Sequence, residues 1–153
     1  MGRDMGDSKR NRIVGFTASA FDLLHAGHIT MLKEAKEHCD YLICGLNVDT
    51  SIDRLDKNSP IQSIAERYIQ LSAVKYVDEI IPYYHEKDLT EILKSYTIDI
   101  RILGEEYKDK DFTGRELCDR LGIKLYFNKR NHDFSSSELR KRMYDRQNTN
   151  RDS

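Results

Sequence analysis

The chain has 153 residues, a length typical of one domain, and its 25 Lys and Arg side chains nearly balance 26 Asp and Glu side chains. A protein that binds nucleic acid without sequence preference normally carries a basic excess, so we expect no nucleic-acid partner. No apolar run reaches the roughly 20 residues that span a bilayer, no signal-peptide core opens the chain, and the 3 scattered cysteines fit neither a disulfide framework nor a zinc site. We therefore expect a cytoplasmic protein with buried, reduced thiols and no membrane contact.

Apolar segments of strand length alternate with segments of helical periodicity along the chain. Residues 1–11 are polar and charged and contain glycine, and they predict a disordered lead. After that lead, the predicted elements in chain order are a strand over 12–17, a helix over 30–38, a strand over 41–46, a helix from Ser59, a strand over 79–82, a helix over 88–95, a strand over 98–103, a helix over 113–121, a strand over 123–127 and a helix from Ser135.

Capping signals mark the ends of three of these helices. Ser59 before Pro60 is typical of a helix start, with the serine as the cap and the proline at the first helical position. Gly122 is typical of a helix end. Ser135 followed three residues later by Glu138 has the pattern of a capping box.

The alternation of strands and helices predicts a parallel sheet with right-handed crossovers. We therefore expect a single α/β domain over 12–146, a Rossmann-like parallel five-stranded sheet with helices on both faces (α/β/α). Because the chain is polar from Gln147 onward, a frayed tail is expected over 147–153. In sheets of this kind ligands bind outside the carboxyl ends of the strands, where the loops after the first, second and fourth predicted strands meet.

The loop after the first predicted strand holds the motif that carries chemistry, His25, Gly27 and His28. Two histidines three residues apart at the start of a helix share one face. The helix N-terminus adds unpaired N–H groups and a partial positive charge, which suit phosphate. Histidines there can donate hydrogen bonds to phosphate oxygens and stabilise charge that grows at an attacked phosphorus centre. The spacing alone also fits a surface pair or, less well, a metal site, because helical zinc pairs usually sit four residues apart.

Five segments, in order, resemble the nucleotidyltransferase superfamily with its H-x-G-H signature, and above all its small cytidylyltransferases. The likeness is greatest to glycerol-3-phosphate cytidylyltransferase, with ethanolamine-phosphate cytidylyltransferase behind, and it extends from Ile13 to about Arg142. The matching segments are 21–28 with the histidine motif, 40–49 at the second strand, 66–82 with a diagnostic helix and strand, 103–107 with a Gly-acidic-acidic-aromatic loop, and 130–139.

The resemblance implies a reaction and its catalytic residues, which are His25, His28, Lys57 and Arg130. A substrate phosphate would attack the α-phosphorus of CTP in line, so that CMP is transferred to a small phosphorylated alcohol and pyrophosphate leaves. Glycerol 3-phosphate is the default acceptor by likeness. Mg²⁺ would be the cofactor, held by the nucleotide phosphates and water rather than by protein ligands. Lys57 stands alone where the family has a pair of lysines, with Arg54 as the candidate second cation.

The same resemblance implies a set of nucleotide-binding residues. Glu106 would lie beside the base, where a carboxylate can accept a hydrogen bond from the amino group that cytosine and adenine both carry. The serines that begin the last helix would hold phosphate through hydroxyls and N–H groups. The full set is Ala18, Ser19, Ala20, Phe21, Asp22, Gly27, Arg67, Gly104, Glu106, Tyr107, Ser135, Ser136 and Ser137.

Besides the missing second lysine, six positions depart from the family pattern, namely Ser19, Ala20, Lys75, His132, Asp133 and Phe134. Several of these positions lie close to nucleotide and acceptor, so the identity of both substrates stays open. One alternative is an adenylyltransferase of the same superfamily that acts on a sugar phosphate or a cofactor precursor. Another alternative is a nucleotide-binding relative without turnover. The single Lys57, where the family has two lysines, favours this alternative, and the intact pair of His25 and His28 argues against it. By resemblance we also expect a homodimer.

Overall fold

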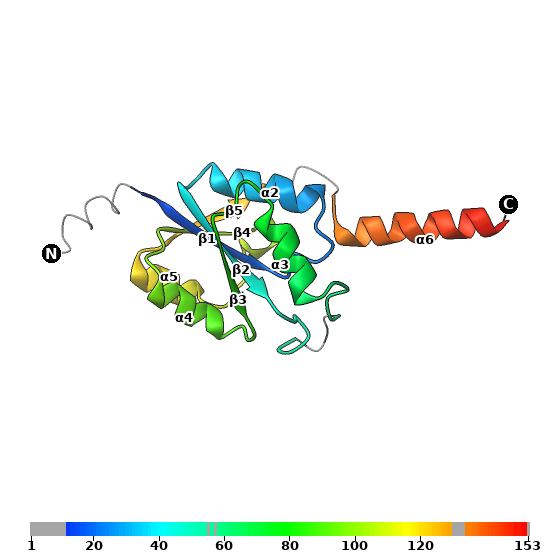
Figure 1. The fold of residues 1–153 in the computed structure, drawn as a ribbon. Coiled ribbons are helices and arrows are strands. Elements are labelled where there is room, and N and C mark those ends of the chain that lie inside the picture. The colour runs from blue at the N-terminus through cyan, green and yellow to red at the C-terminus, as the bar shows by residue number, and fades with distance from the viewer. Residues whose placement is uncertain (1–11, 55, 57, 130–133, 153) are drawn as a thin grey trace.

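The computed structural model describes residues 12–54, 56, 58–129 and 134–152, so the predicted lead over 1–11 lies outside the described residues (Figure 1). In chain order the elements are β1 (Val14–Ser19), α2 (Ala26–Lys36), β2 (Tyr41–Asn47), α3 (Ile64–Ser72), β3 (Glu79–Tyr83), α4 (Asp88–Ser95), β4 (Ile100–Gly104), a short 3-10 helix (Glu105–Tyr107), α5 (Arg115–Leu121), β5 (Lys124–Asn128) and α6 (Ser136–Asp152).

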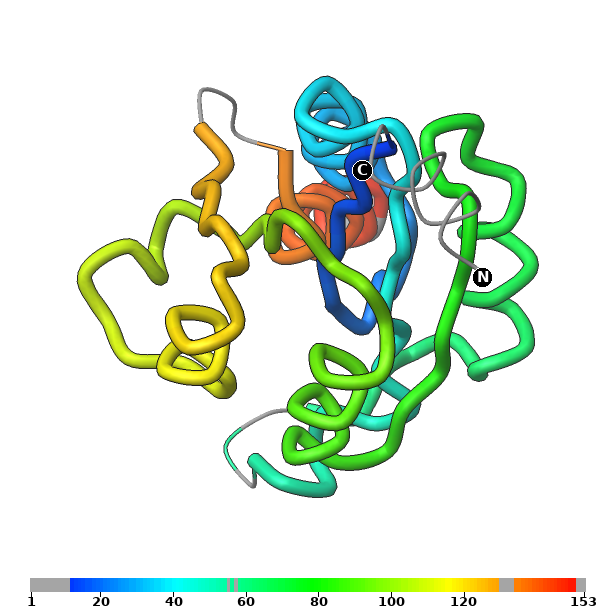
Figure 2. The backbone as a smooth tube through the Cα atoms, turned by 90° about the vertical axis from the view of Figure 1, so that its left-hand side faces the viewer, coloured from blue at the N-terminus to red at the C-terminus, as the bar shows by residue number. Residues whose placement is uncertain are grey.

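The strands form one five-stranded sheet in the order β3-β2-β1-β4-β5, and every neighbouring pair is parallel. Figure 1 shows α2 and α3 on one face of this sheet and α4 and α5 on the other. Helix α6 extends away from the body, and Figure 2 shows it end-on. The predicted single Rossmann-like α/β domain is therefore confirmed, and its central strand β1 is the one that leads into the histidine motif.

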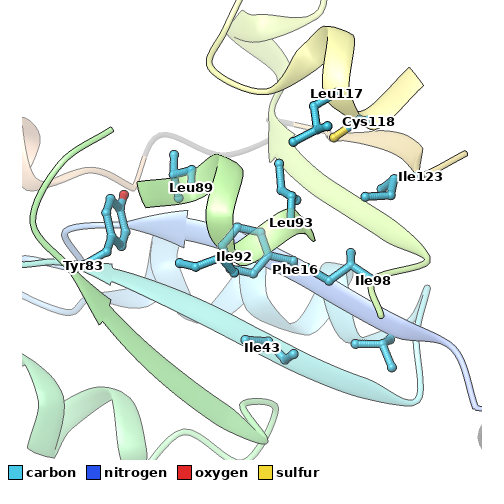
Figure 3. Close-up of a cluster of buried hydrophobic side chains, with 11 residues drawn as sticks. Phe16, Ile43, Tyr83, Leu89, Ile92, Leu93, Ile98, Leu117, Cys118 and Ile123 are labelled. Atoms are coloured by element: carbon cyan, nitrogen blue, oxygen red, sulfur yellow. The ribbon is translucent and has the colours of Figure 1, made fainter. Parts of the chain in front are cut away.

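An apolar cluster covers each face of the sheet. On the α4 and α5 side, Phe16 and Ile43 from the strands pack against Leu93 from α4 and Leu117 from α5 (Figure 3). The second cluster lies between the sheet and helices α2 and α3. Strand β2 is apolar at nearly every position because both of its faces are covered. The 3 cysteines are buried and free, as expected from their spacing.

Two helix starts differ from the sequence prediction, and hydrogen bonds explain both. Helix α2 begins at Ala26, before the predicted residue 30, because the His25 side chain caps it. The start at Ser59 is wrong, since α3 begins at Ile64 with Ser63 as its cap. The carboxylate of Asp22 accepts the backbone N–H groups of residues 61 and 62, which holds this stretch outside the helix.

The last helix is longer than predicted. Ser135 caps α6 as expected, because its Oγ accepts from the backbone N–H of Glu138 at 3.0 Å. The helix then continues through Asp152, past Gln147, where the polar sequence predicted fraying. Lys141 and Asp145, four residues apart and 3.1 Å between Nζ and Oδ2, form a helical ion pair that favours this continuation.

Candidate active site

The loop between β1 and α2 has a strained backbone that other residues hold in place. Phe21 and Leu23 have φ angles of 49° and 51°, in the left-handed region that non-glycine residues rarely adopt. Between them, the carboxylate of Asp22 accepts from the N–H groups of Ile61 at 2.8 Å and Gln62 at 3.0 Å. The Gln62 side chain in turn accepts from the N–H of Leu23 at 2.8 Å. These bonds fix the loop against the segment before α3, and so fix the start of α2.

Arg67 of α3 lies behind this loop and is only 2% exposed. Its Nε donates to the carbonyl of Gln62, and its terminal nitrogens donate to the carbonyls of Ala20, Asn47 and Val48 at 3.0, 2.6 and 2.6 Å. The guanidinium therefore ties together the carboxyl ends of β1 and β2. These backbone carbonyls take up its donors, so Arg67 supports the loops, and nucleotide binding by its side chain stays a prediction.

The two histidines of the motif cap their own helix reciprocally. Nδ1 of His25 accepts from the backbone N–H of Gly27 at 3.0 Å, and Nδ1 of His28 accepts from the backbone N–H of His25 at 3.1 Å. The ring centroids lie 4.0 Å apart. In the usual capping box these two places are taken by a Ser or Thr and a Glu or Gln. Here the cap fixes both imidazole rings at a helix N-terminus.

The cap also sets which nitrogen of each ring carries a proton. Because each Nδ1 accepts a hydrogen bond, a neutral ring must carry its proton on Nε2. Burial, and next the neighbouring His25, lower the pKa of His28 to about 4, while Asp22 acts in the opposite direction. His28 is therefore neutral at physiological pH, and its Nε2–H is a hydrogen-bond donor.

The rings border a cavity of about 280 Å³, which we name the histidine cavity. Two helix N-termini meet at it, those of α2 and α6, and both favour an anion. A side chain on Gly27 would lie 2.8 Å from the carbonyl oxygen of Phe134, so the glycine is what lets the two helices approach. The lining residues are His25, Gly27, His28, Met31, Glu34, Gly104, Glu105, Glu106, Asn128, Lys129, Phe134, Ser135 and Ser136.

A second cavity, of about 640 Å³, adjoins the first one and shares Met31, Gly104 and Glu106 with it. We name it the arginine cavity after Arg101, which lines it and is only 5% exposed. The Arg101 guanidinium donates to the carbonyl of Thr113 at 2.6 Å and lies over the ring of Phe112. The described residues offer it no ion-pair partner. A buried cation without an ion-pair partner in direct contact favours an anionic ligand.

Carboxylates line the arginine cavity as well, from Asp53, Glu86 and Asp111. Asp53 accepts from the backbone N–H of Glu86 at 2.5 Å and lies 3.1 Å from a ring nitrogen of His85, which ties the loop after β2 to the start of α4. Carboxylates accept hydrogen bonds from hydroxyl groups. The cavity thus combines one buried cation with several acceptors.

The predicted site residues fall into three groups by position. Those on the histidine cavity are His25, Gly27, His28, Gly104, Glu106, Ser135 and Ser136. Those on the arginine cavity are Ala18, Ser19 and Tyr107, together with the shared Gly104 and Glu106. Those that line neither cavity and instead support the loops or stand apart are Ala20, Phe21, Asp22, Arg67 and Ser137.

Four further predictions concern residues outside the described ones, namely Lys57, Arg130, His132 and Asp133. Arg54, the candidate second cation, lines the arginine cavity. Lys75 is exposed and lies just before β3, at the amino end of that strand and so at the opposite edge of the sheet. Its ammonium lies 5.3 Å from the ring centroid of Tyr76. Lys75 is therefore a surface residue rather than a phosphate contact.

Arg101 and Asn128 are buried polar residues of the two cavities that were not predicted from the sequence. Arg101 stands between Ile100 and Ile102 in a strand that is covered on both faces, and a charge at such a place is a usable signal, because burying it is costly. Asn128 ends β5 at the ligand-binding edge of the sheet.

Across the part of the chain that the structure describes, no group of three His, Cys, Asp or Glu side chains is arranged to hold a metal ion. In the same part, none of the helices has the length and apolar character needed to cross a membrane.

Comparisons with known proteins agree with this geometry. The family model described as "Cytidylyltransferase-like" matches residues 16–142. The Bifunctional protein HldE of Paramagnetospirillum magneticum is 36% identical over 118 residues, which is 76% of this chain and 24% of that protein. The Bifunctional protein HldE of Campylobacter jejuni is 35% identical over 116 residues, with shares of 75% and 25%. The chain thus spans about a quarter of the length of these relatives.

A solved structure is similar over most of both chains. It is the crystal structure of the lipopolysaccharide core biosynthesis protein from Thermoplasma volcanium, with a TM-score of 0.63 and 30% sequence identity. The match covers 80% of this chain and 99% of that one.

Proposed function

Because the chain belongs to the cytidylyltransferase-like family of nucleotidyltransferases, we propose that it transfers AMP from ATP to a small sugar phosphate and releases pyrophosphate. The observation that carries the proposal is the reciprocal cap of His25 and His28, which presents Nε2–H donors at a helix N-terminus. The predicted superfamily is confirmed. The narrower likeness to glycerol-3-phosphate cytidylyltransferase, and with it CTP as the donor, stays a prediction.

In the proposed reaction, a phosphate oxygen of the acceptor attacks the α-phosphorus of ATP. One P–O bond forms to the acceptor, the P–O bond to pyrophosphate breaks, and its electron pair leaves with pyrophosphate. The Nε2–H groups of His25 and His28 and the N-termini of α2 and α6 donate to the phosphate oxygens on which charge grows. Catalysis is then positioning and charge stabilisation, with no covalent enzyme intermediate.

The N–H donors of the histidine cavity suit the phosphates of a triphosphate that brings Mg²⁺ with it. Among the described residues, no group of three or more His, Cys, Asp or Glu side chains is arranged to hold a metal ion, and the carboxylate of Asp22 is engaged by the N–H groups of Ile61 and Gln62. We expect phosphate oxygens and water to hold most of the coordination sites of Mg²⁺, as this ion prefers, and the ion would neutralise phosphate charge there. The protein's own part is to orient the phosphates.

The arginine cavity supports a sugar phosphate as the acceptor. Arg101 offers a buried cation for an anionic group, and the carboxylates of Asp53, Glu86 and Asp111 offer acceptors for hydroxyl groups. The similar protein from Thermoplasma volcanium is named for lipopolysaccharide core biosynthesis, and a lipopolysaccharide contains sugars. Both acceptors would offer a phosphate and hydroxyl groups to this cavity, and the name of the similar protein favours the phosphorylated sugar.

The test is pyrophosphate release in the presence of Mg²⁺, with ATP or CTP as the donor and a panel of sugar phosphates and glycerol 3-phosphate as acceptors. We expect release with ATP and at least one sugar phosphate. Release with CTP and glycerol 3-phosphate alone would restore the cytidylyltransferase alternative. No release with any pair, from a protein that binds ATP and is folded, would favour a binding protein without turnover.

A further inference from the structure

Asn128 ends β5 with a buried amide that finds no hydrogen-bond partner among the described residues, at either its oxygen or its nitrogen. The residue is 6% exposed and lines the histidine cavity. Burying an unpaired amide is unfavourable, and such groups in proteins nearly always have a partner. A ligand in the histidine cavity would supply one.

Asn47 gives an internal comparison, because it ends β2 in the same way and is 5% exposed. Its side-chain oxygen accepts from the backbone N–H of Asp49 at 3.0 Å, and the residue lines neither cavity. The fold thus satisfies the buried amide that lines neither cavity. The amide left without a partner, that of Asn128, is the one at the cavity wall.

The carboxylate of Glu106 lies near Asn128, because Glu106 follows the end of the neighbouring strand β4. Asn128 is the register partner of Gly104 in the parallel pair of β4 and β5. Position 128 faces α2, because Tyr126, two residues earlier, bonds Glu34 of that helix. A Cβ on Gly104 would lie 1.8 Å from Oε1 of Glu106, so the glycine leaves room for that carboxylate. Glu106 and Asn128 therefore line the same part of the cavity.

This part lies away from the histidines. Glu34 also lines the cavity, and it follows His25 by nine residues along α2, which corresponds to about 13 Å of helix. A nucleoside triphosphate with its phosphates at His25 and His28 would place its base near Asn128.

We propose that Asn128, with Glu106, recognises the base of the donor nucleotide and selects one with an amino group beside an unprotonated ring nitrogen. The inference rests on the proposed function. An ionised carboxylate only accepts, so Glu106 takes the N–H of the base amine, while the amide N–H of Asn128 donates to the ring nitrogen. Adenine and cytosine present this pair. Hypoxanthine and uracil place a carbonyl oxygen against the carboxylate, which disfavours them.

Calorimetric titration of the full chain in Mg²⁺ tests the proposal, with ATP, CTP, ITP and inorganic tripolyphosphate as ligands. Wild-type protein should bind ATP at least about tenfold more tightly than ITP, which carries hypoxanthine. Asn128→Leu should bind ATP about tenfold more weakly, lose most of the preference over ITP, and bind tripolyphosphate as before. The ligand-free melting temperature should rise in Asn128→Leu and fall in the matched control Asn47→Leu, because only Asn47 has a partner in the protein.

The outcomes separate this inference from the proposed function. Equal ATP affinity of wild type and Asn128→Leu, or an equal loss for ATP and tripolyphosphate, overturns base recognition by Asn128 and leaves the proposed function standing. A wild-type protein that binds neither ATP nor CTP overturns both. Asn128→Asp, which has nearly the same shape but no amide N–H, gives the same comparison if Asn128→Leu does not fold, and it too should lose ATP affinity and keep that for tripolyphosphate.

Discussion

The histidine cavity and the arginine cavity adjoin each other, yet they are built in different ways. In the histidine cavity, His25 and His28 are fixed by backbone groups of their own helical turn. In the arginine cavity, Arg101 comes from the middle of β4, Arg54 from the loop after β2 and Glu86 from the segment before α4. The two histidines proposed to act on the phosphates are thus positioned by residues close to them in sequence. The groups that would select the acceptor come together only when the chain folds.

The largest expected effect is at Arg67, which holds the loops after β1 and β2 and so supports both cavities. Arg67→Ala removes the donors of four backbone carbonyls, at the ends of β1 and β2 and before α3. We expect the free energy of unfolding to fall by about 3 kcal/mol or more, as for other losses of a buried hydrogen-bonded network. Urea unfolding measures it, with the exposed Lys75→Ala as a control within about 0.5 kcal/mol of wild type. A loss below about 1 kcal/mol would contradict the supporting role.

Replacement of His28 separates the cap from the chemistry in the histidine cavity. His28→Ala removes both and should slow turnover by at least about a hundredfold, as loss of a charge-stabilising donor does. His28→Gln keeps an acceptor for the N–H of His25, since Gln serves at this place of a capping box. The free energy of unfolding of His28→Gln should be close to that of wild type, while its kcat should be much lower. If His28→Gln matches wild-type kcat, the ring has no role in the transition state.

Replacement of Arg101 tests whether the arginine cavity serves the acceptor alone. Arg101→Gln keeps a donor for the carbonyl of Thr113 but removes the charge. We expect KM for the sugar phosphate to rise by about tenfold or more, with KM for ATP nearly unchanged, because an anionic group loses its charged partner. Steady-state kinetics with each substrate varied in turn measure it. A rise in KM for ATP alone would mean that the two cavities have been assigned the wrong way round.

The pH dependence of stability gives the smallest expected effect, and it belongs to the histidine cavity. Since the folded-state pKa of His28 is lowered from 6.5 to about 4, the unfolded chain binds more protons between these values. Stability from this group is full above pH 6.5 and is lost as pH falls toward 4, by about 1 kcal/mol between pH 7 and 5.5. Urea unfolding at both pH values measures it. His28→Gln should flatten this slope, and an unchanged slope would rule out His28 as its source.

Much of the fold could be predicted, because alternating strands and helices leave few topologies open. The range of α4 over 88–95 agrees with the structure, since apolar spacing alone defines that helix. The start of α3 could not be predicted from Ser59 and Pro60. The deciding bonds come from Asp22, about 40 residues away in sequence, which binds residues 61 and 62 and leaves Ser63 as the cap.

The site residues differ in the same way, since some are positioned by nearby residues and others by contacts distant in sequence. His25, Gly27 and His28 could be found from the sequence, because their geometry is set within one helical turn. Asn128 could not, since its importance comes from strand register that brings it beside Gly104 and Glu106. The support that Arg67 gives to the loops could not be predicted either, because a sequence does not show that backbone carbonyls surround a guanidinium.

The most direct test of the central claim follows the α-phosphate of the donor. Wild-type protein is incubated with Mg²⁺, ATP labelled at the α-phosphate and a panel of sugar phosphates, and the products are separated. The account predicts that the label moves into a nucleotide-sugar in amounts equal to the pyrophosphate released, and that His28→Gln reduces both together. Label that stays in ATP with every acceptor, in a folded protein that binds ATP, would contradict nucleotidyl transfer at the histidine cavity.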